Sequence, residues 1–179
     1  MDALKEQGVA QTANTESVKP VRICFVCTGN TCRSPMAEAF TRALAQDALA
    51  RLPDPLRSIA VPLVAATSAG LYPMEGAPIS QGACSALERE GIMPTPDHDY
   101  HDHCARLIDP CTVENADLLV GMTHGHAMEL LLRFPQAASR IVCMPSEIPD
   151  PYGGDEEVYR SCLQAIQKGV YTLLADYFS

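Results

Sequence analysis

The residues between Val26 and Pro35 read Cys-Thr-Gly-Asn-Thr-Cys-Arg-Ser, which groups two thiols, three hydroxyls and a guanidinium. A short loop from a parallel strand into a helix points successive backbone N–H groups into one concavity, which binds an anion. Arg33 adds a planar fork that holds two phosphate oxygens at once. The same positive groups stabilise a thiolate on Cys27, a nucleophile for phosphorus. The segment therefore predicts a phosphate-binding loop that reacts through a phosphocysteine.

Other residues of this loop have predicted supporting roles. Gly29 and Asn30 are residue types that tolerate the positive φ that such a loop requires. Ser34 lies beside the loop and is expected to donate a hydrogen bond to the sulfur when it departs. Ser34 is also the expected N-cap of the following helix, with Pro35 at the first helical position. We expect phosphate to contact the loop formed by Thr28, Gly29, Asn30, Thr31, Cys32, Arg33 and Ser34.

A leaving group departs as a strong base unless a general acid protonates it. Three Asp-Pro pairs compete for this role, at Asp54, Asp109 and Asp150. Asp54 follows a Pro-rich helix exit and Asp109 precedes another Pro-Cys turn, so both are expected to form turns. Asp150 follows the predicted fourth strand in a Gly-rich loop, at the same sheet edge as Cys27. We therefore predict Asp150 as the acid and Tyr152 as a residue of the pocket mouth.

Short apolar runs alternate along the chain with segments of helical spacing, which predicts an α/β fold with a four-stranded parallel sheet and helices on both faces (doubly wound). Ligands of such sheets bind beyond the carboxyl ends of the strands. Residues 1–19 are expected to form a flexible extension, and residues 20–179 a single domain. The predicted strands are Val21–Val26, Leu63–Thr67, Asp117–Gly121 and Arg140–Met144. The first predicted helix starts at Ser34, and two more span Ser80–Glu90 and Thr123–Phe134. Gly91–Cys111 is expected to be irregular. A last helix is predicted from the helical spacing of Val158, Cys162, Ile166, Val170, Leu173 and Tyr177.

The composition excludes several classes of protein. Thirteen Lys and Arg against 22 Asp and Glu give a net charge of −9, which disfavours binding to nucleic acid or to an anionic membrane. No apolar run approaches the roughly 18 residues of a membrane helix. Residues 1–19 lack the order of a secretory signal, so a cytoplasmic protein is expected. The eight cysteines are then expected as thiols rather than as a disulfide framework.

A redox pair at Cys24 and Cys27 and a zinc site were also considered. Cys24 lies inside the predicted first strand, where a thiol is buried and inert. The histidine and cysteine spacings fit no closed zinc site, and no second Cys-x-x-Cys exists, so no metal is predicted. The residues weighed for zinc were His98, His101, His103, Cys104, His124 and His126; we expect the last two to cap or flank a helix.

The segment Val26–Glu38 resembles the phosphate loop of the low-molecular-weight protein tyrosine phosphatases. Ser68-Ala69-Gly70, Ala116-Asp117-Leu118 and Asp150-Pro151-Tyr152 follow in the order found in that family. The resemblance therefore covers Val21 to Tyr177. It implies a four-stranded parallel sheet and a phosphatase that acts on phosphorylated proteins or peptides without a cofactor.

The resemblance also implies roles for particular residues. Cys27 is the nucleophile, Arg33 binds phosphate and Asp150 is the acid. Asn30 holds the shape of the loop, and Ser34 supports the leaving thiolate.

Three more residues gain an interpretation from the same family. The segment Asp102–Arg106 resembles one whose histidine hydrogen-bonds the loop asparagine, which makes His103 the expected partner of Asn30. Cys32 is expected either to pack as a small residue or to trap oxidised Cys27 as a reversible disulfide. Tyrosine-directed members usually carry Ile or Leu at the position of Thr31, while the arginine-phosphatase branch carries Thr. The resemblance thus favours phosphoarginine, with phosphotyrosine as the alternative substrate.

Two rival functions remain at this point. A thioredoxin-coupled arsenate reductase shares this loop, but it needs redox cysteines near the exit of the third strand, and Gly121–His126 contains none. A silent phosphoprotein-binding module needs no nucleophile and no acid, whereas Cys27 and Asp150 supply both.

Overall fold

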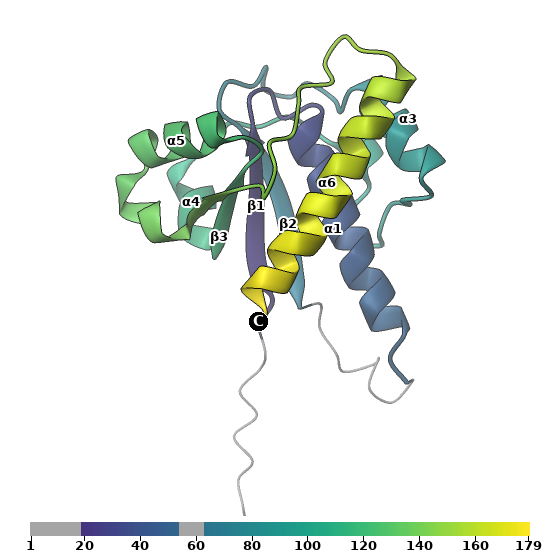
Figure 1. Cartoon of the computed structure of the whole chain (residues 1–179), viewed down its shortest axis with the longest axis horizontal. Helices are drawn as coiled ribbons and strands as arrows, with labels where there is room; N and C mark the ends of the chain where they lie inside the picture. Colours follow the sequence, from purple (N-terminus) through teal and green to yellow (C-terminus); the bar gives the residue numbers. More distant parts are fainter. Residues whose placement is uncertain (1–18, 54–62) are drawn as a thin grey trace, which may run out of the picture.

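The computed structural model describes residues 19–53 and 63–179 (Figure 1). Residues 1–18 of the predicted extension lie outside the described part of the chain. Asp54, the first of the three Asp-Pro candidates, also lies outside it.

The described residues form one four-stranded parallel sheet with the order β2-β1-β3-β4. This confirms the predicted fold class. The strands are short and mainly apolar, as expected for strands that are covered on both faces. The strands are β1 (Val21–Cys27), β2 (Val64–Gly70), β3 (Leu118–Gly121) and β4 (Ile141–Cys143).

Helices cover both faces of this sheet. On one face α1 and α6 run side by side with α3 next to them, and α4 and α5 lie against the other face (Figure 1). The helices are α1 (Arg33–Ala50), α3 (Gln81–Arg89), α4 (Pro110–Asn115), α5 (His124–Arg133) and α6 (Glu156–Tyr177), with 3-10 turns at Tyr100–Asp102 and Pro135–Arg140.

The side chains of β1 divide the core into two parts. Ile23 and Phe25 point into the larger cluster, which includes residues of α1, α3 and α6. Cys24 and Val26 point the other way, into a smaller cluster with Leu130 of α5. Because side chains alternate along a strand, β1 contributes side chains to the core on both faces of the sheet.

Several predicted helix ends are confirmed. The side chain of Ser80 accepts a hydrogen bond from Ala83 N at the start of α3, and that of Thr123 accepts one from His126 N at the start of α5. Gly91 follows α3 with φ +69°, a conformation that favours glycine at a helix end.

The predicted start of the first helix is wrong by two residues. Helix α1 begins at Arg33, and its N-cap is Cys32, which makes no side-chain capping bond. Ser34 lies inside the first turn, and its hydroxyl contacts the sulfur of Cys27. The hydroxyl that was expected to cap the helix instead contacts Cys27 and Asn30 of the loop region.

The second strand is longer than predicted. It continues through Ser68 to Gly70, because these residues pair in register with Phe25–Cys27 of β1. A Cβ on Gly70 would lie 2.9 Å from the carbonyl oxygen of Thr28. The absence of a side chain at Gly70 lets the end of β2 pack directly against the phosphate loop.

Two smaller predictions need correction. The region expected to be irregular includes the start of α4, where the Asp109 carboxylate accepts a hydrogen bond from Thr112 N at 2.6 Å. In α6, Val158 and Tyr177 are 44% and 45% exposed, and Tyr159 is buried instead. The helical spacing was right, but the first and last residues predicted for the buried stripe are exposed.

Candidate active site

Cys27 is the last residue of β1, and the loop of residues 28–32 leads from it into α1. Its sulfur is buried and lies 3.3 Å from the backbone N of Asn30 and 3.0 Å from Oγ of Ser34. Both groups can donate a hydrogen bond to this sulfur. The sulfur of Cys27 thus lies at the base of the loop, within reach of two groups that can donate hydrogen bonds to it.

Asn30 ties the loop to three other segments of the chain. Its Nδ2 donates to Oγ of Ser34 at 3.0 Å and to Oγ of Ser68 at 2.9 Å. Its Oδ1 accepts from the backbone N of Arg106 at 3.0 Å, and its carbonyl oxygen lies 2.7 Å from Nε2 of His103. Every polar atom of the Asn30 side chain is therefore paired. His103 reaches Asn30, as predicted, at the backbone rather than at the amide.

The left-handed residue of the loop is Asn30, with φ +54°. Gly29 was expected to share this conformation and does not. A Cβ at Gly29 would meet only Oγ1 of Thr31 within 4 Å, at an ordinary contact distance of 3.7 Å. One left-handed residue is enough to turn the loop. The hydrogen bonds of the Asn30 side chain offset the cost of its left-handed backbone conformation.

Arg33 and Asp150 meet across the mouth of the loop. The guanidinium donates from Nη2 to Asp150 Oδ2 at 2.6 Å and from Nη1 to the carbonyl oxygen of Ile148 at 3.4 Å. The other carboxylate oxygen of Asp150 accepts from the backbone N of Tyr152 at 3.2 Å. The structure thus brings together the predicted phosphate binder and the predicted acid.

His126 is a site residue that the sequence analysis did not identify beyond a helix start. Its imidazole is buried between two hydroxyls, with Nε2 3.0 Å from Oγ1 of Thr28 and Nδ1 2.9 Å from Oγ1 of Thr123. Burial, and then the nearby positive charge of Arg33, lower the pKa of His126 to about 4. A neutral imidazole therefore links the phosphate loop to the cap of α5. The signal in the sequence was a histidine three residues after a helix cap, which alone does not indicate a contact with Thr28.

Cys32 lies inside the loop and is also buried. Its sulfur lies 3.2 Å from Oγ of Ser80 and 3.5 Å from the hydroxyl of Tyr159. Burial raises the pKa of Tyr159 to about 12, so this hydroxyl keeps its proton. Cys24, the first cysteine of the alternative redox pair, is fully buried, and desolvation raises its pKa to about 12. Cys24 is therefore an inert core thiol, as expected.

The remaining histidines have local partners. His101 contacts the carboxylates of Asp99 and Glu88, and His124 contacts that of Glu147. Within residues 19–53 and 63–179, no group of three or more His, Cys, Asp or Glu side chains is arranged to hold a metal ion. No helix in that part of the chain is long and apolar enough to cross a membrane.

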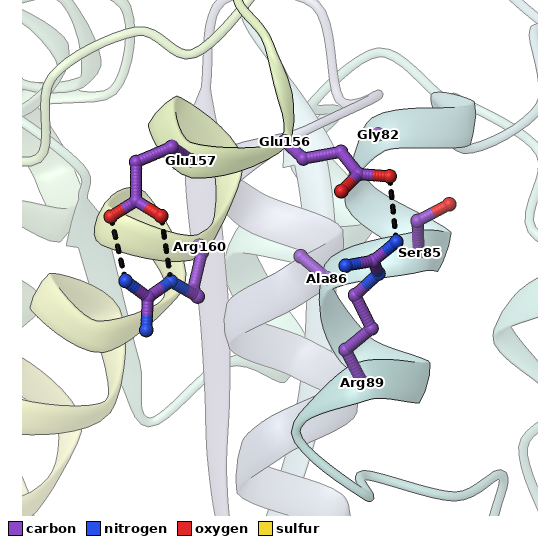
Figure 2. A pocket seen from close by; sticks show the side chains of 7 residues that line it. All are labelled: Gly82, Ser85, Ala86, Arg89, Glu156, Glu157 and Arg160. Atoms are coloured by element: carbon purple, nitrogen blue, oxygen red, sulfur yellow. Dashed lines mark hydrogen bonds and ion pairs between the residues drawn. The ribbon is translucent and has the colours of Figure 1, made fainter.

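A small cavity of about 90 Å³ between α3 and α6 contains none of the predicted site residues (Figure 2). Arg89 pairs with Glu156 at 2.8 Å at one side of it, and Arg160 pairs with Glu157 at 2.7 Å at the other. These side chains are half exposed or more, and solvent screens such surface pairs, so they contribute little to stability. We assign this cavity no part in the chemistry.

The parallel α/β sheet carries a cysteine and an arginine at the loop that follows its first strand, which is the arrangement that the sequence analysis predicted for a phosphatase. The comparisons with known proteins agree. The sequence profile described as "Low molecular weight phosphotyrosine protein phosphatase" matches residues 22–177. The chain belongs to this family and is a protein phosphatase.

The relatives of the chain include two kinds of enzyme. It is 32% identical to a protein-arginine-phosphatase of Geobacillus stearothermophilus over 155 residues, which cover 83% of this chain and 90% of that protein. It is 33% identical to a low molecular weight protein-tyrosine-phosphatase of Streptomyces coelicolor over 168 residues, 86% and 92% of the two chains.

Solved structures give the same picture. The YwlE arginine phosphatase from Geobacillus stearothermophilus has a TM-score of 0.71 and 29% identity, with 88% of this chain and 93% of that chain covered. The low molecular weight protein tyrosine phosphatase from T. tengcongensis has a TM-score of 0.72 and 31% identity, with 87% and 99% covered.

Proposed function

We propose that this enzyme hydrolyses phosphorylated protein side chains with Cys27 as its nucleophile. The observation that carries the proposal is the sulfur of Cys27, 3.0 Å from Oγ of Ser34 and 3.3 Å from the backbone N of Asn30. In the first step the thiolate attacks phosphorus, and the bond from phosphorus to the side chain of the substrate breaks. In the second step water attacks the phosphocysteine, and the thiolate departs with a hydrogen bond from Ser34.

Arg33 and Asp150 divide the remaining work. A phosphoryl group in the loop presents oxygens that compete with Asp150 for the guanidinium of Arg33, which now donates to that carboxylate at 2.6 Å. Asp150, once released and protonated, supplies the proton that the leaving group takes with it. The same carboxylate then accepts a proton from the attacking water. Arg33 holds the equatorial oxygens of phosphate through both steps.

We infer that phosphoarginine is the preferred substrate and that Thr31 selects it. The hydroxyl of Thr31 can hydrogen-bond a guanidinium nitrogen, whereas an Ile at that position would leave the nitrogen unpaired. Each donor desolvated without a partner costs about 1–3 kcal/mol. The carboxyl group of Asp150 also accepts hydrogen bonds from the guanidinium of the substrate. The exposed ring of Tyr152 follows Asp150 two residues later in the chain. The relative named as an arginine phosphatase supports this preference, and the one named as a tyrosine phosphatase supports the alternative.

The substrate preference is tested by measuring kcat/KM on two peptides that differ only in carrying phosphoarginine or phosphotyrosine at one position. Wild type should favour phosphoarginine, and Thr31→Ile should move the ratio of kcat/KM toward phosphotyrosine by roughly tenfold or more, equivalent to about 1.4 kcal/mol. Thr172→Ile, an exposed position on α6, is the matched control and should leave the ratio unchanged. A wild type that favours phosphotyrosine, or a ratio that Thr31→Ile does not move, would remove the arginine assignment and leave the phosphatase.

We also propose that Cys27 and Cys32 form a reversible redox pair. Oxidation of Cys27 by peroxide gives a sulfenic acid, and attack by the sulfur of Cys32 then forms a disulfide and releases water. Both sulfurs are buried in the same loop, which supports the pairing. The disulfide protects the nucleophile from further oxidation until a thiol reduces it.

A further inference from the structure

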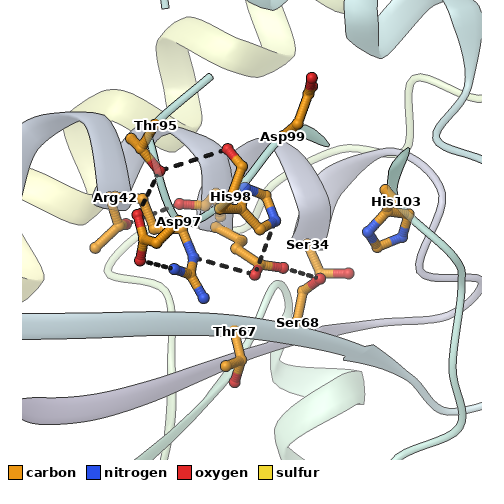
Figure 3. A network of polar contacts seen from close by, with 12 residues as sticks. Ser34, Arg42, Thr67, Ser68, Thr95, Asp97, His98, Asp99 and His103 are labelled. Carbon is orange, nitrogen blue, oxygen red and sulfur yellow. Dashed lines mark hydrogen bonds and ion pairs between the residues drawn. The ribbon is translucent and has the colours of Figure 1, made fainter. Parts of the chain in front are cut away.

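A network of polar contacts in the protein interior includes Ser68, Arg42 and His98 (Figure 3). Ser68 Oγ accepts from Nδ2 of Asn30 at 2.9 Å and donates to Oε2 of Glu38 at 2.7 Å. Glu38 lies in the second turn of α1 and is 5% exposed. One hydroxyl therefore separates the loop asparagine from a buried carboxylate.

The other oxygen of this carboxylate has two basic neighbours. His98 Nε2 lies 3.2 Å from Glu38 Oε1, and Arg42 Nε lies 3.3 Å from the same atom. Arg42 also donates from Nη1 to Asp97 at 2.8 Å. A buried carboxylate is costly unless it is paired and hydrogen-bonded, and here both oxygens are.

A tight turn holds His98 against α1. The backbone N–H groups of Thr95 and His98 each donate to the carbonyl oxygen of the other, at 2.9 and 3.0 Å. Oγ1 of Thr95 donates to Asp97 at 2.8 Å, so the side chain next to His98 is fixed as well. The side chain of His98 is 17% exposed, which places it where the network meets the surface.

These contacts decide the charge of Glu38. Burial alone raises the pKa of this carboxyl, but hydrogen bonds from His98 and then Ser68, together with the charge of Arg42, hold it below its usual range. The other titratable groups that act on this site or feel its charge are Asp97 beside Arg42, His103 from the segment before α4 and Cys24 from β1.

We propose that His98 is a positioning residue for the nucleophile: it keeps Glu38 ionised, and Glu38 orients Ser68 so that Asn30 holds the phosphate loop in its reactive shape. This inference rests on the proposed function. An ionised Glu38 accepts only, so the Ser68 proton points to it and the lone pairs of Ser68 stay free for Nδ2 of Asn30. A protonated Glu38 donates to Ser68 instead, so the Ser68 proton loses its acceptor and the hydroxyl is no longer held with its lone pairs toward Nδ2 of Asn30.

Variants at two neighbouring histidines test the proposal. His98→Phe removes the donor and keeps a ring, and His98→Gln keeps an N–H donor. His101→Phe is the matched control, because His101 contacts only Asp99 and Glu88 at the surface. The measurements are kcat for an aryl phosphate between about pH 5 and pH 8, and the rate at which iodoacetamide alkylates Cys27 over the same range, followed by mass spectrometry of the Cys27 peptide.

Loss of the His98 donor raises the pKa of Glu38, so the carboxylate is lost at a higher pH. In His98→Phe the acid limb of both profiles should move to higher pH, with kcat roughly tenfold below wild type at the acid end and near wild type at the alkaline end. His98→Gln should restore most of this loss, and His101→Phe should follow wild type. In a Ser68→Ala background the effect of His98→Phe should disappear, because the link it acts through is absent.

Three results would overturn the proposal: a loss equal at every pH, no rescue by Gln, or an undiminished effect beside Ser68→Ala. If His98→Phe does not fold, Glu38→Gln decides, since its neutral amide stands in for the protonated carboxyl at every pH: kcat and the alkylation rate should both be lowered across the whole range, and a variant that matches wild type contradicts the proposal. A wild type that hydrolyses no aryl phosphate would refute the proposed function, and the alkylation profiles would still decide the role of His98.

Discussion

The loop of residues 28–32 leads into Arg33, and Asp150 contacts Arg33 from the other side, but the surroundings of these two parts differ. Cys27, Asn30 and Ser34 are at most 2% exposed, and the hydrogen bonds of Asn30 reach β2, the segment before α4 and α1. The side chain of Asp150 is 52% exposed, and Tyr152 is 78% exposed. One side is thus fixed from within, and the other faces the solvent.

This difference matches the two tasks that we propose for the site. A phosphate group is the same in every substrate, so its binding gains from a loop whose polar atoms are already oriented. In the described part of the chain, no buried side-chain nitrogen or oxygen lacks a hydrogen-bond partner. The substrate side chain and its peptide vary, and an exposed acid and an exposed aromatic ring can meet them without the cost of opening a core.

The exposed side of the comparison is tested by Asp150→Asn. Hydrolysis should slow by roughly 10²–10⁴ when the leaving group is basic, because the amide cannot supply a proton. The loss should shrink for an activated aryl phosphate, whose leaving group departs without help. Asp109→Asn is the control, since Asp109 caps α4 and lies outside the proposed chemistry. Equal losses on both substrates would make Asp150 a structural residue.

The buried side is tested by the pH dependence of stability at His126. Its folded pKa of about 4 lies below the usual value of about 6.5, so the unfolded chain binds more protons in between. The His126 contribution to the free energy of unfolding is therefore complete above about pH 6.5 and falls as the pH drops toward 4, by roughly 1–3 kcal/mol.

Denaturant unfolding of wild type and His126→Gln measures this effect. The difference between the two should narrow as the pH falls through that window. His101→Gln is the control with the opposite sign, because hydrogen bonds from Glu88 and Asp99 raise the pKa of His101. If the difference in the free energy of unfolding between wild type and His126→Gln does not change with pH, His126 is not held neutral.

The smallest effect concerns recovery from oxidation within the phosphate loop. Peroxide should inactivate the wild type, and a thiol reductant should restore most activity through the Cys27–Cys32 disulfide. Cys32→Ser should recover less, with Cys104→Ser, at an exposed cysteine outside the loop, as the control. Identical recovery in wild type and Cys32→Ser would leave Cys32 as a packing residue.

The phosphate loop could be predicted from the sequence because its parts are contiguous between Cys27 and Ser34. The fold class followed in the same way from apolar runs that each form one strand. The local competition for Ser34 could not be resolved, since a serine at a helix start can cap the helix or serve the loop. In the structure the hydroxyl of Ser34 contacts the sulfur of Cys27 rather than capping the helix. The position of that sulfur depends on where β1 ends.

The supporting residues could not be found from spacing. His126 lies 98 residues from Thr28, and Ser68 lies 38 residues from Asn30. Such contacts depend on strand order and register, which place β2 and the start of α5 beside the end of β1. The contact between Glu38 and His98 additionally depends on the turn at Thr95–His98, within a stretch that shows no periodicity.

The central claim is that Cys27 carries the phosphoryl group, and trapping it tests this most directly. An acid quench during turnover of an aryl phosphate, followed by mass spectrometry, should find the phosphoryl group on the Cys27 peptide. Cys27→Ser should hydrolyse no substrate while it still binds vanadate, because the N–H groups of the loop and Arg33 remain. Continued turnover by Cys27→Ser, or a phosphoryl group trapped on another residue, would contradict the account.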